Sequence, residues 1–210
     1  MENQGMVKVK SKKFVAVSPT KCTGCSLCEY VCALAHNERP LNPRRARLRV
    51  IRATPAFNLV MTCRFCDDAP CVRACPREAL IQSEENGLIK VIESKCDGCG
   101  WCVQACPYGG ISIHPDKTSV LVCDLCESEG EPQCIKFCPE EALDLVTSDK
   151  EANKRLALAI ENIPIEAERI TRIVKEKAWD SLLAEAEERA KRLSEKLEAI
   201  DKKWGVKIKL

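Results

Sequence analysis

Up to Val146, apolar residues occur in short runs bounded by turn residues, a pattern typical of short β-strands. The Asn86-Gly87 dipeptide is a strong hairpin signal between the runs at 80–81 and 88–92. A second turn, at 114–117, separates 111–113 from 119–122. Strands are therefore predicted at 14–17, 47–52, 58–61, 80–81, 88–92, 111–113, 119–122 and 143–146. The pattern predicts an α+β fold of small two-stranded sheets and short helices.

After Val146 the spacing of apolar residues changes to that of amphipathic helices. Ser148 and Glu151 form a capping box, which predicts a helix that ends at about Ile160. Pro164 suits the first position of a second helix, which runs to Trp204. We therefore expect a Cys-rich domain at 14–147 and an amphipathic helical extension at 148–205.

The apolar stripe of the extension is long. Its members are Ile165, Ile170, Ile173, Val174, Leu182, Leu183, Ala186, Ala190, Leu193, Leu197, Ile200 and Trp204. A break near Asp180-Ser181 is equally compatible with this spacing. Such a stripe packs either on the chain's own Cys-rich domain or on a partner, and the sequence leaves both open.

The cysteines indicate the chemistry of the chain. There are sixteen, in four groups of four that we call quartets: Cys22, Cys25, Cys28, Cys32; Cys63, Cys66, Cys71, Cys75; Cys96, Cys99, Cys102, Cys106; and Cys123, Cys126, Cys134, Cys138. Each quartet begins C-x2-C and ends C-x3-C, and the first and third have the full spacing of bacterial 4Fe–4S ferredoxins. Because each such cluster takes four thiolates, the sequence predicts four 4Fe–4S clusters.

The C-x3-C end of each quartet covers about one helical turn, so its two cysteines lie on one face. In three quartets proline follows at Pro76, Pro107 or Pro139 and ends the helix. The first quartet differs, because Ala33 follows Cys32. We therefore expect a different backbone geometry where the chain leaves Cys32.

Other uses of cysteine fit less well. Disulfides need an oxidising compartment, and Met1–Lys13 lacks the apolar segment of a secretory signal, so we expect a cytoplasmic protein. Zinc ribbons use two C-x2-C pairs and need no third and fourth cysteine. The radical-SAM run C-x3-C-x2-C, nucleotide-binding glycine motifs and long apolar spans are absent from the sequence. No catalytic site of its own and no membrane span are expected.

The remaining polar and aromatic residues give weaker signals. The formal charge of +2 shows no basic excess, which argues against a nucleic-acid partner. Four clusters would take the charge to about −6, and basic residues near the quartets are expected to offset part of it: Lys21, Arg64, Arg73, Arg77, Lys95 and Lys136. We expect structural roles for His36 and His114. Trp101 and Tyr108 are expected to pack on a cluster and shield it from water.

The order of the four spacings resembles that of the four-cluster iron–sulfur subunits of the dimethyl-sulfoxide-reductase type, over about residues 14–147. The broader group includes electron-transfer subunits of formate dehydrogenases, CO dehydrogenases, hydrogenases and tungsten aldehyde oxidoreductases. The resemblance implies two nested ferredoxin-like units. Quartets one and four make the outer unit, quartets two and three the inner one, and 14–17 is placed to pair with 143–146.

The resemblance also implies that each quartet donates its last cysteine to a neighbouring cluster. The implied ligand sets, which we call sites I to IV, are Cys22, Cys25, Cys28 and Cys138 (site I); Cys32, Cys123, Cys126 and Cys134 (site II); Cys63, Cys66, Cys71 and Cys106 (site III); and Cys75, Cys96, Cys99 and Cys102 (site IV). Spacing alone does not give this assignment.

The function implied is a relay of single electrons between a catalytic subunit and an external carrier. The favoured catalytic partner is a soluble molybdenum- or tungsten-pterin oxidoreductase, with an aldehyde oxidoreductase plausible, and the carrier is ferredoxin or another redox subunit. A CO dehydrogenase or hydrogenase complex is the alternative. A self-sufficient redox enzyme is disfavoured because every cluster already has four cysteines, and a purely structural cluster protein would hold clusters that are not reduced at physiological potentials.

Overall fold

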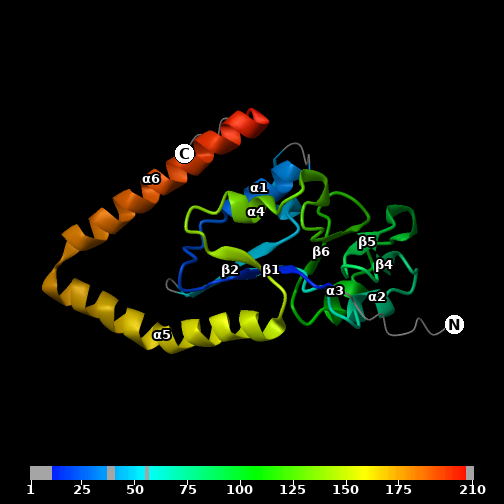
Figure 1. Ribbon diagram of the computed structural model, residues 1–210, viewed down its shortest axis with the longest axis horizontal. Coiled ribbons are helices and arrows are strands. Elements are labelled where there is room, and N and C mark those ends of the chain that lie inside the picture. Colours follow the sequence, from blue (N-terminus) through cyan, green and yellow to red (C-terminus); the bar gives the residue numbers. More distant parts are fainter. Residues whose placement is uncertain (1–10, 37–40, 55–56, 207–210) are drawn as a thin grey trace.

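The structure is a computed structural model that describes residues 11–36, 41–54 and 57–206. These residues form a Cys-rich body of short strands and helices, from which two long helices extend (Figure 1). The strands are β1 (Phe14–Val17), β2 (Arg49–Thr54), β3 (Phe57–Met61), β4 (Leu80–Gln82), β5 (Ile89–Val91), β6 (Ile111–Ile113), β7 (Val120–Val122) and β8 (Leu143–Val146). The helices are α1 (Leu27–Ala35), α2 (Pro70–Arg73), α3 (Trp101–Ala105), α4 (Gln133–Lys136), α5 (Asp149–Glu176) and α6 (Trp179–Trp204).

Within the described ranges the strands form four two-stranded antiparallel sheets: β1–β8, β2–β3, β4–β5 and β6–β7. Strands β1 and β8 come from opposite ends of the Cys-rich body, and Phe14 pairs with Val146. The three hairpins lie between them in the sequence, so one unit is nested inside the other. The predicted α+β class, the nested arrangement and the pairing of 14–17 with 143–146 are confirmed.

All eight predicted strands are present, with small shifts at their ends. The largest is at β2, which begins at Arg49 instead of Arg47 and extends to Thr54. The N–H of Arg47 donates to the sulfur of Cys32 at 3.2 Å and not to a strand partner. A cysteine therefore fixes the beginning of this hairpin.

Cysteines belong to the core of the body. Phe14, Phe65 and Val146 are almost completely buried, and their apolar cluster includes Cys63 and Cys71. A second cluster, around Val15 and Leu143, contains Cys32, Cys134 and Cys138. Because cysteines make up part of this core, the free energy of binding metal at their thiols contributes directly to the stability of the fold.

The first C-terminal helix begins where expected, but the second begins at Trp179 and not at Pro164, close to the break that the spacing allowed near Asp180-Ser181. Ser148 caps α5, its hydroxyl oxygen accepting from the N–H of Lys150 at 3.2 Å. The predicted end at about Ile160 is wrong, because α5 continues through Pro164 to Glu176. The division falls at Lys177, whose φ of 52° is left-handed, and the N–H of Ala178 donates to the carbonyl of Ile173 at 3.1 Å. This bond is the helix-ending motif that sequence spacing did not reveal.

Pro164 should weaken the middle of α5, because it removes one backbone donor and crowds the preceding turn. We expect Pro164→Ala to stabilise the helix locally by about 3 kcal/mol. Amide hydrogen exchange around residues 160–168 should slow by about 100-fold. Glu161→Ala, at an exposed neighbouring position, is the control. Equal exchange in Pro164→Ala and the parent would show that the proline costs this helix nothing.

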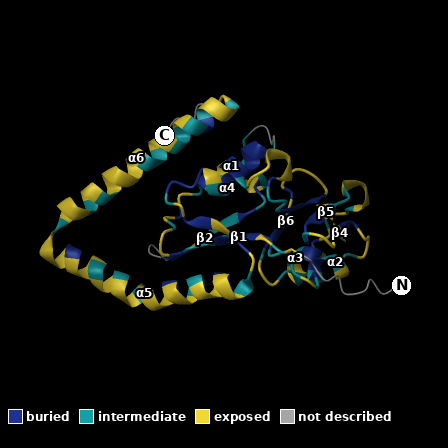
Figure 2. Ribbon diagram, viewed as in Figure 1, coloured by how far each residue is buried: buried dark blue, intermediate teal, exposed yellow. Residues whose placement is uncertain are grey.

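The second half of α6 packs on α1 and α4 of the body (Figures 1 and 2). Ile200 is fully buried in an apolar cluster with Leu27 and Val31 of α1, and the rings of Phe137 and Trp204 lie 5.3 Å apart. This half of the stripe therefore packs on the chain itself. The far end of the two helices exposes other members, Ile165, Ile170, Val174 and Leu183 among them. Among the described helices, none combines the length and apolar character needed to cross a bilayer.

Candidate functional site

All sixteen cysteines lie in the described part of the chain, and all are free thiols. Helix α1 contains both cysteines of its C-x3-C end, whereas α2, α3 and α4 contain only the first and end one or two residues before the second. The C-x2-C loops precede these helices. Cys25 and Cys99 are exposed, whereas the other fourteen are buried or half-buried. Most of the thiols are therefore held away from solvent.

Two groups of four cysteines each line a small cavity. Cys22, Cys25, Cys28 and Cys138 lie around one of them. Cys75, Cys96, Cys99 and Cys102 lie around the other. In both cavities three cysteines of one quartet meet the last cysteine of a different quartet. These are the sets expected for sites I and IV.

Electrostatic coupling joins the remaining cysteines. Burial, followed by repulsion from Cys71, Cys66 and Cys106, raises the pKa of the Cys63 thiol to about 12. The pKa of Cys71 also rises to about 12, through burial and then Cys106 and Cys66. These four are the residues expected for site III.

The fourth group behaves in the same way. Burial, followed by repulsion from Cys123, Cys32, Cys28 and Cys126, raises the pKa of Cys134 well above its usual value. Apart from Cys28, which is expected in site I, these are the residues expected for site II. Thiolates so close together are strongly unfavourable unless a cation neutralises them. Iron bound at these positions would supply that positive charge, so the residues present fit 4Fe–4S clusters.

Backbone amides hold the last cysteine of each quartet. After the three Cys-Pro exits, the residue four positions on donates its N–H to the sulfur, at 3.3 to 3.4 Å: Ala79 to Cys75, Gly110 to Cys106 and Ala142 to Cys138. At Cys32, which precedes Ala33, the N–H of Arg47 donates instead, at 3.2 Å. The expected difference at the first quartet is therefore present, and a distant segment replaces the local amide.

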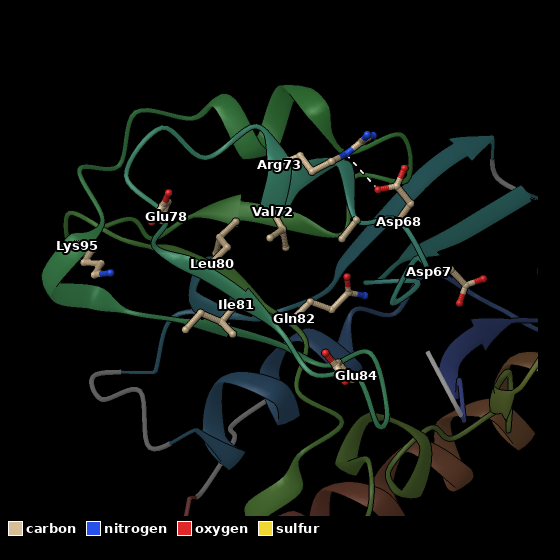
Figure 3. Close-up of a pocket in the computed structure, with 11 residues that line it drawn as sticks. Asp67, Asp68, Val72, Arg73, Glu78, Leu80, Ile81, Gln82, Glu84 and Lys95 are labelled. Carbon is tan, nitrogen blue, oxygen red and sulfur yellow. Dashed lines mark ion pairs between the residues drawn. The ribbon is translucent and has the colours of Figure 1, made fainter. Parts of the chain in front are cut away.

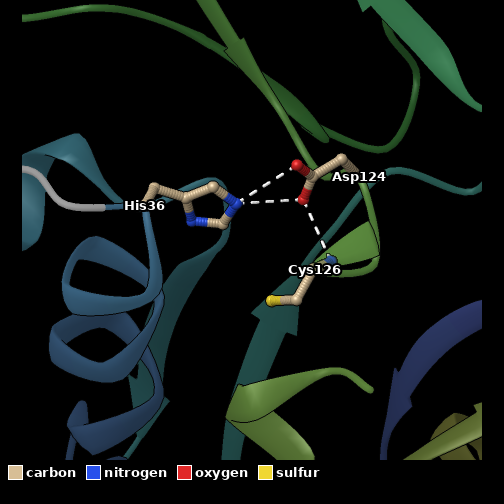
Figure 4. Close-up of side chains that lie close together, drawn as sticks. All are labelled: His36, Asp124 and Cys126. Carbon is tan, nitrogen blue, oxygen red and sulfur yellow. Dashed lines mark hydrogen bonds and ion pairs between the residues drawn. The ribbon is translucent and has the colours of Figure 1, made fainter. Parts of the chain in front are cut away.

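His36, Asp124 and Cys126 lie close enough to suggest a separate metal site (Figure 4). However, Nδ1 of His36 lies 2.7 Å from the carbonyl oxygen of Cys32, and Nε2 lies 3.0 Å from Asp124. Both partners only accept hydrogen bonds, so both ring nitrogens carry protons. Burial opposes this charge, but the hydrogen bonds to Asp124 and Cys32 raise the pKa of His36 to about 10. A cationic imidazole does not bind metal, so His36 has the structural role expected.

Asp124 is the centre of this network. Its carboxylate also accepts from the backbone N–H of Cys126 at 3.0 Å and pairs with Arg47. Although burial acts in the opposite direction, the hydrogen bond from His36 and the charge of Arg47 hold the pKa of this carboxyl well below its usual range. The network joins the segments that carry Cys32 and Cys126. Because its members are far apart in the chain, the network has no local signal in the sequence.

The predicted shielding by aromatic residues is wrong for Trp101. Its side chain is 60% exposed, and Tyr108 is 39% exposed. Tyr108 packs instead on the guanidinium of Arg64, 4.9 Å from its ring centroid, and Arg64 also lies 5.0 Å from the Phe14 ring. His114 is buried, and its Nδ1 accepts from the backbone of Asp116 and Lys117, which makes it structural as expected.

Several basic residues near the quartets are already paired with carboxylates. Arg64 pairs with Asp149, Arg73 with Asp68, Arg77 with Asp97 and Lys136 with Glu131. Each pair has little net charge. The expected compensation of cluster charge by these four side chains is therefore weaker than the sequence suggested.

An open cavity of about 410 Å³ lies beside α2 and β4 (Figure 3). Charged residues line much of it, with Arg73 paired to Asp68 at 3.1 Å and Asp67, Glu84 and Lys95 nearby. No cysteine lines this cavity. It therefore lies outside the four cysteine groups.

Comparison with known families agrees with this chemistry. The family model of the 4Fe-4S dicluster domain matches residues 56–148. The match therefore ends immediately before α5, which begins at Asp149. It covers the inner unit and the later part of the outer one.

Individual proteins match over a longer stretch. The chain is 42% identical to the polyferredoxin-like subunit of an aliphatic sulfonate oxidoreductase from Pyrococcus furiosus, over 68% of this chain and 82% of that protein. It is 36% identical to the putative electron transport protein YsaA of Escherichia coli, over 69% of this chain and 96% of that protein. With the electron transport protein HydN of Escherichia coli it shares 34% identity, over 66% of this chain and 90% of that protein. A solved structure of the benzoyl coenzyme A reductase complex BamBC matches 76% of this chain and 96% of its own at 25% identity, but its TM-score is only 0.39.

Proposed function

The chain belongs to the family of 4Fe-4S dicluster ferredoxin-type electron-transport subunits, and we propose that it relays single electrons through four 4Fe–4S clusters within an oxidoreductase complex. One observation carries this proposal: cysteines of different quartets lie together, around two shared cavities and elsewhere close enough to repel one another. When bound, the clusters supply one-electron oxidation and reduction. The chain's own residues hold them in place and limit their contact with water.

We propose crossed ligation at sites I to IV, with the last cysteine of each quartet bound to the neighbouring cluster. Two cavities support it, because Cys138 lines one together with the first quartet and Cys75 lines the other together with the third. The raised pKa values of Cys63 and Cys134 support the other two sets. Crossed ligation fixes two clusters side by side within each unit.

Repulsion between cysteines of different sites also supports a linear order of the four sites. Repulsion from Cys28 helps to raise the pKa of Cys134, which supports a position of site I beside site II. Burial, and then repulsion from Cys32 and Cys63, raises the pKa of Cys123, which supports a position of site II beside site III. Repulsion from Cys102 helps to raise the pKa of Cys71, which supports a position of site III beside site IV. The exposed thiols, Cys25 and Cys99, belong to the two end sites, where electrons would enter and leave.

The catalytic partner that we propose is a molybdenum- or tungsten-pterin oxidoreductase subunit, and the second partner is ferredoxin or another redox subunit. The polyferredoxin-like subunit from Pyrococcus furiosus supports an oxidoreductase complex, because its name assigns it to one. The absence of C-x3-C-x2-C and nucleotide motifs from the sequence supports a catalytic site on another subunit.

The test is anaerobic purification of the chain with its native companions, followed by metal analysis of the largest companion. We expect molybdenum or tungsten in that subunit, and substrate-dependent reduction of clusters in this chain. Nickel in that subunit, without molybdenum or tungsten, would contradict the pterin partner and indicate a hydrogenase or CO dehydrogenase. Turnover of substrate by the isolated chain would contradict the relay.

A further inference from the structure

The helices of the first and third quartets begin with the same local backbone. Ser26 precedes α1 with a φ of 62°, and Gly100 precedes α3 with a φ of 81°, both left-handed. Aligning the cysteines places Leu27 of α1 at the same position as Trp101 of α3. The helix pair α1–α4 in the outer unit therefore corresponds to the pair α2–α3 in the inner unit, and each pair packs together.

Helix α6 covers the outer pair. Leu27, Val31 and Leu34 of α1 are buried in an apolar cluster with Ile200. At the edge of this contact, Arg192 of α6 pairs with Glu140 at 2.7 Å. Figure 1 shows α6 lying along α1 and α4.

The inner pair is uncovered in the part of the chain that the structure describes. Trp101, at the position of Leu27, is 60% exposed. Ile113 is 50% exposed, and its side chain lies 3.6 Å from where a Cβ on Gly100 would be. The position that is buried under α6 in the outer unit is thus open to solvent in the inner unit, with a second exposed apolar side chain beside it.

The charge at the edge of the inner pair differs from that of the outer pair. Arg77 occupies the position of Glu140, two residues after the last cysteine of its quartet. Arg77 and Asp97 form a pair at 3.0 Å, but both side chains are exposed, and such a pair is weak enough for Arg77 to exchange Asp97 for a partner's carboxylate. Because Arg192 of α6 would meet Arg77 here, α6 of a second copy fits this face poorly. A helix with an acidic residue at that point is the complementary occupant.

We propose that the face formed by Trp101 of α3, Ile113 of β6 and Arg77, which follows α2, binds an amphipathic helix of the redox partner subunit, with an acidic side chain against Arg77. The proposal rests on the relay function, since the exposed Cys99 lines one cavity with Arg77 and Gly100. A partner bound here would have its own redox centre close to site IV. One electron would then pass at a time, so that the donor loses one electron and the acceptor gains one.

Site-specific photo-crosslinking tests the occupant. A photoreactive residue replaces Trp101 in the chain, which is then purified within its native complex and irradiated. We expect the crosslink in a helical segment of the redox partner subunit that has an acidic residue within one turn of the crosslinked position. A crosslink to a second copy of this chain, to a non-helical segment, or to no protein at all overturns the proposal.

Affinity for the purified partner subunit gives a second, matched measurement. Trp101→Ala should weaken binding by about 30-fold, as expected for an aromatic at an interface centre. Leu183→Ala, at a side chain that is also 60% exposed, should change it by less than about two-fold. Arg77→Glu should weaken binding, and replacing the partner's acidic residue with lysine should restore it. Equal effects of Trp101→Ala and Leu183→Ala contradict the docking site.

Iron content and dithionite reduction of each variant separate the two proposals. If the chain binds about sixteen irons in clusters that dithionite reduces, and Trp101→Ala leaves partner binding unaffected, the docking site is overturned and the relay stays intact. Few irons in the parent chain would overturn the relay itself. Because Trp101 is largely exposed, its replacement should not disturb folding.

Discussion

Cys106→Ser is expected to remove the cluster at site III and leave the cluster at site IV in place. Cys106 belongs to the third quartet by sequence, but its thiolate repels those of Cys63 and Cys71 in the second. Loss of one ligand should lower the iron content from about sixteen to about twelve per chain. The measurement is anaerobic iron and sulfide analysis, with electron paramagnetic resonance of the reduced protein to identify the missing signal.

Cys75→Ser is the matched control for this variant. It removes the last cysteine of the second quartet, which lines the cavity with Cys96 and Cys99. A similar loss of iron is expected, but the missing signal should be that of site IV. If each variant removes the cluster bound by the first three cysteines of its own quartet, crossed ligation is wrong.

Gly110→Ala is expected to destabilise the inner unit severely. A Cβ at this position would lie 2.6 Å from both the Cα of Cys63 and the carbonyl oxygen of Thr62. These are backbone atoms, so no side-chain rotation relieves the clash. The N–H of Gly110 also donates to the sulfur of Cys106 at 3.4 Å. We expect a loss of about 3 kcal/mol or more in the free energy of unfolding, together with loss of the site III cluster.

Gly130→Ala provides the comparison for Gly110→Ala. Gly130 has a φ of 76°, but no other atom lies within 4 Å of its Cβ position. Its replacement adds backbone strain without a clash and should cost only about 1 kcal/mol. Thermal unfolding and iron content of both variants are the measurements. Similar losses for the two variants would show that backbone strain, and not contact with Cys63, determines the effect.

The sequence was sufficient for features that depend on nearby residues. The cysteine quartets predict the cofactor because four thiolates per cluster is a fixed chemical requirement. Asn86-Gly87 predicts the hairpin of β4 and β5 because such a turn restricts the backbone locally. The helices at the C-x3-C ends were predicted for the same reason, although only α1 contains both cysteines.

Features that depend on tertiary contacts could not be predicted in this way. The exposure of Trp101 follows from which helix pair α6 covers, which is not encoded in the third quartet. The bond from Arg47 to Cys32 joins segments fifteen residues apart. Pro164 is tolerated within α5, although its local preference is for a helix start.

The most direct test of the central claim is the number of irons and sulfides bound per chain in oxygen-free preparations. Four clusters predict about sixteen of each, with all of the iron in 4Fe–4S form by Mössbauer spectroscopy. A value near eight, or zinc in place of iron, would contradict the assignment of four groups of four cysteines to four electron-carrying clusters.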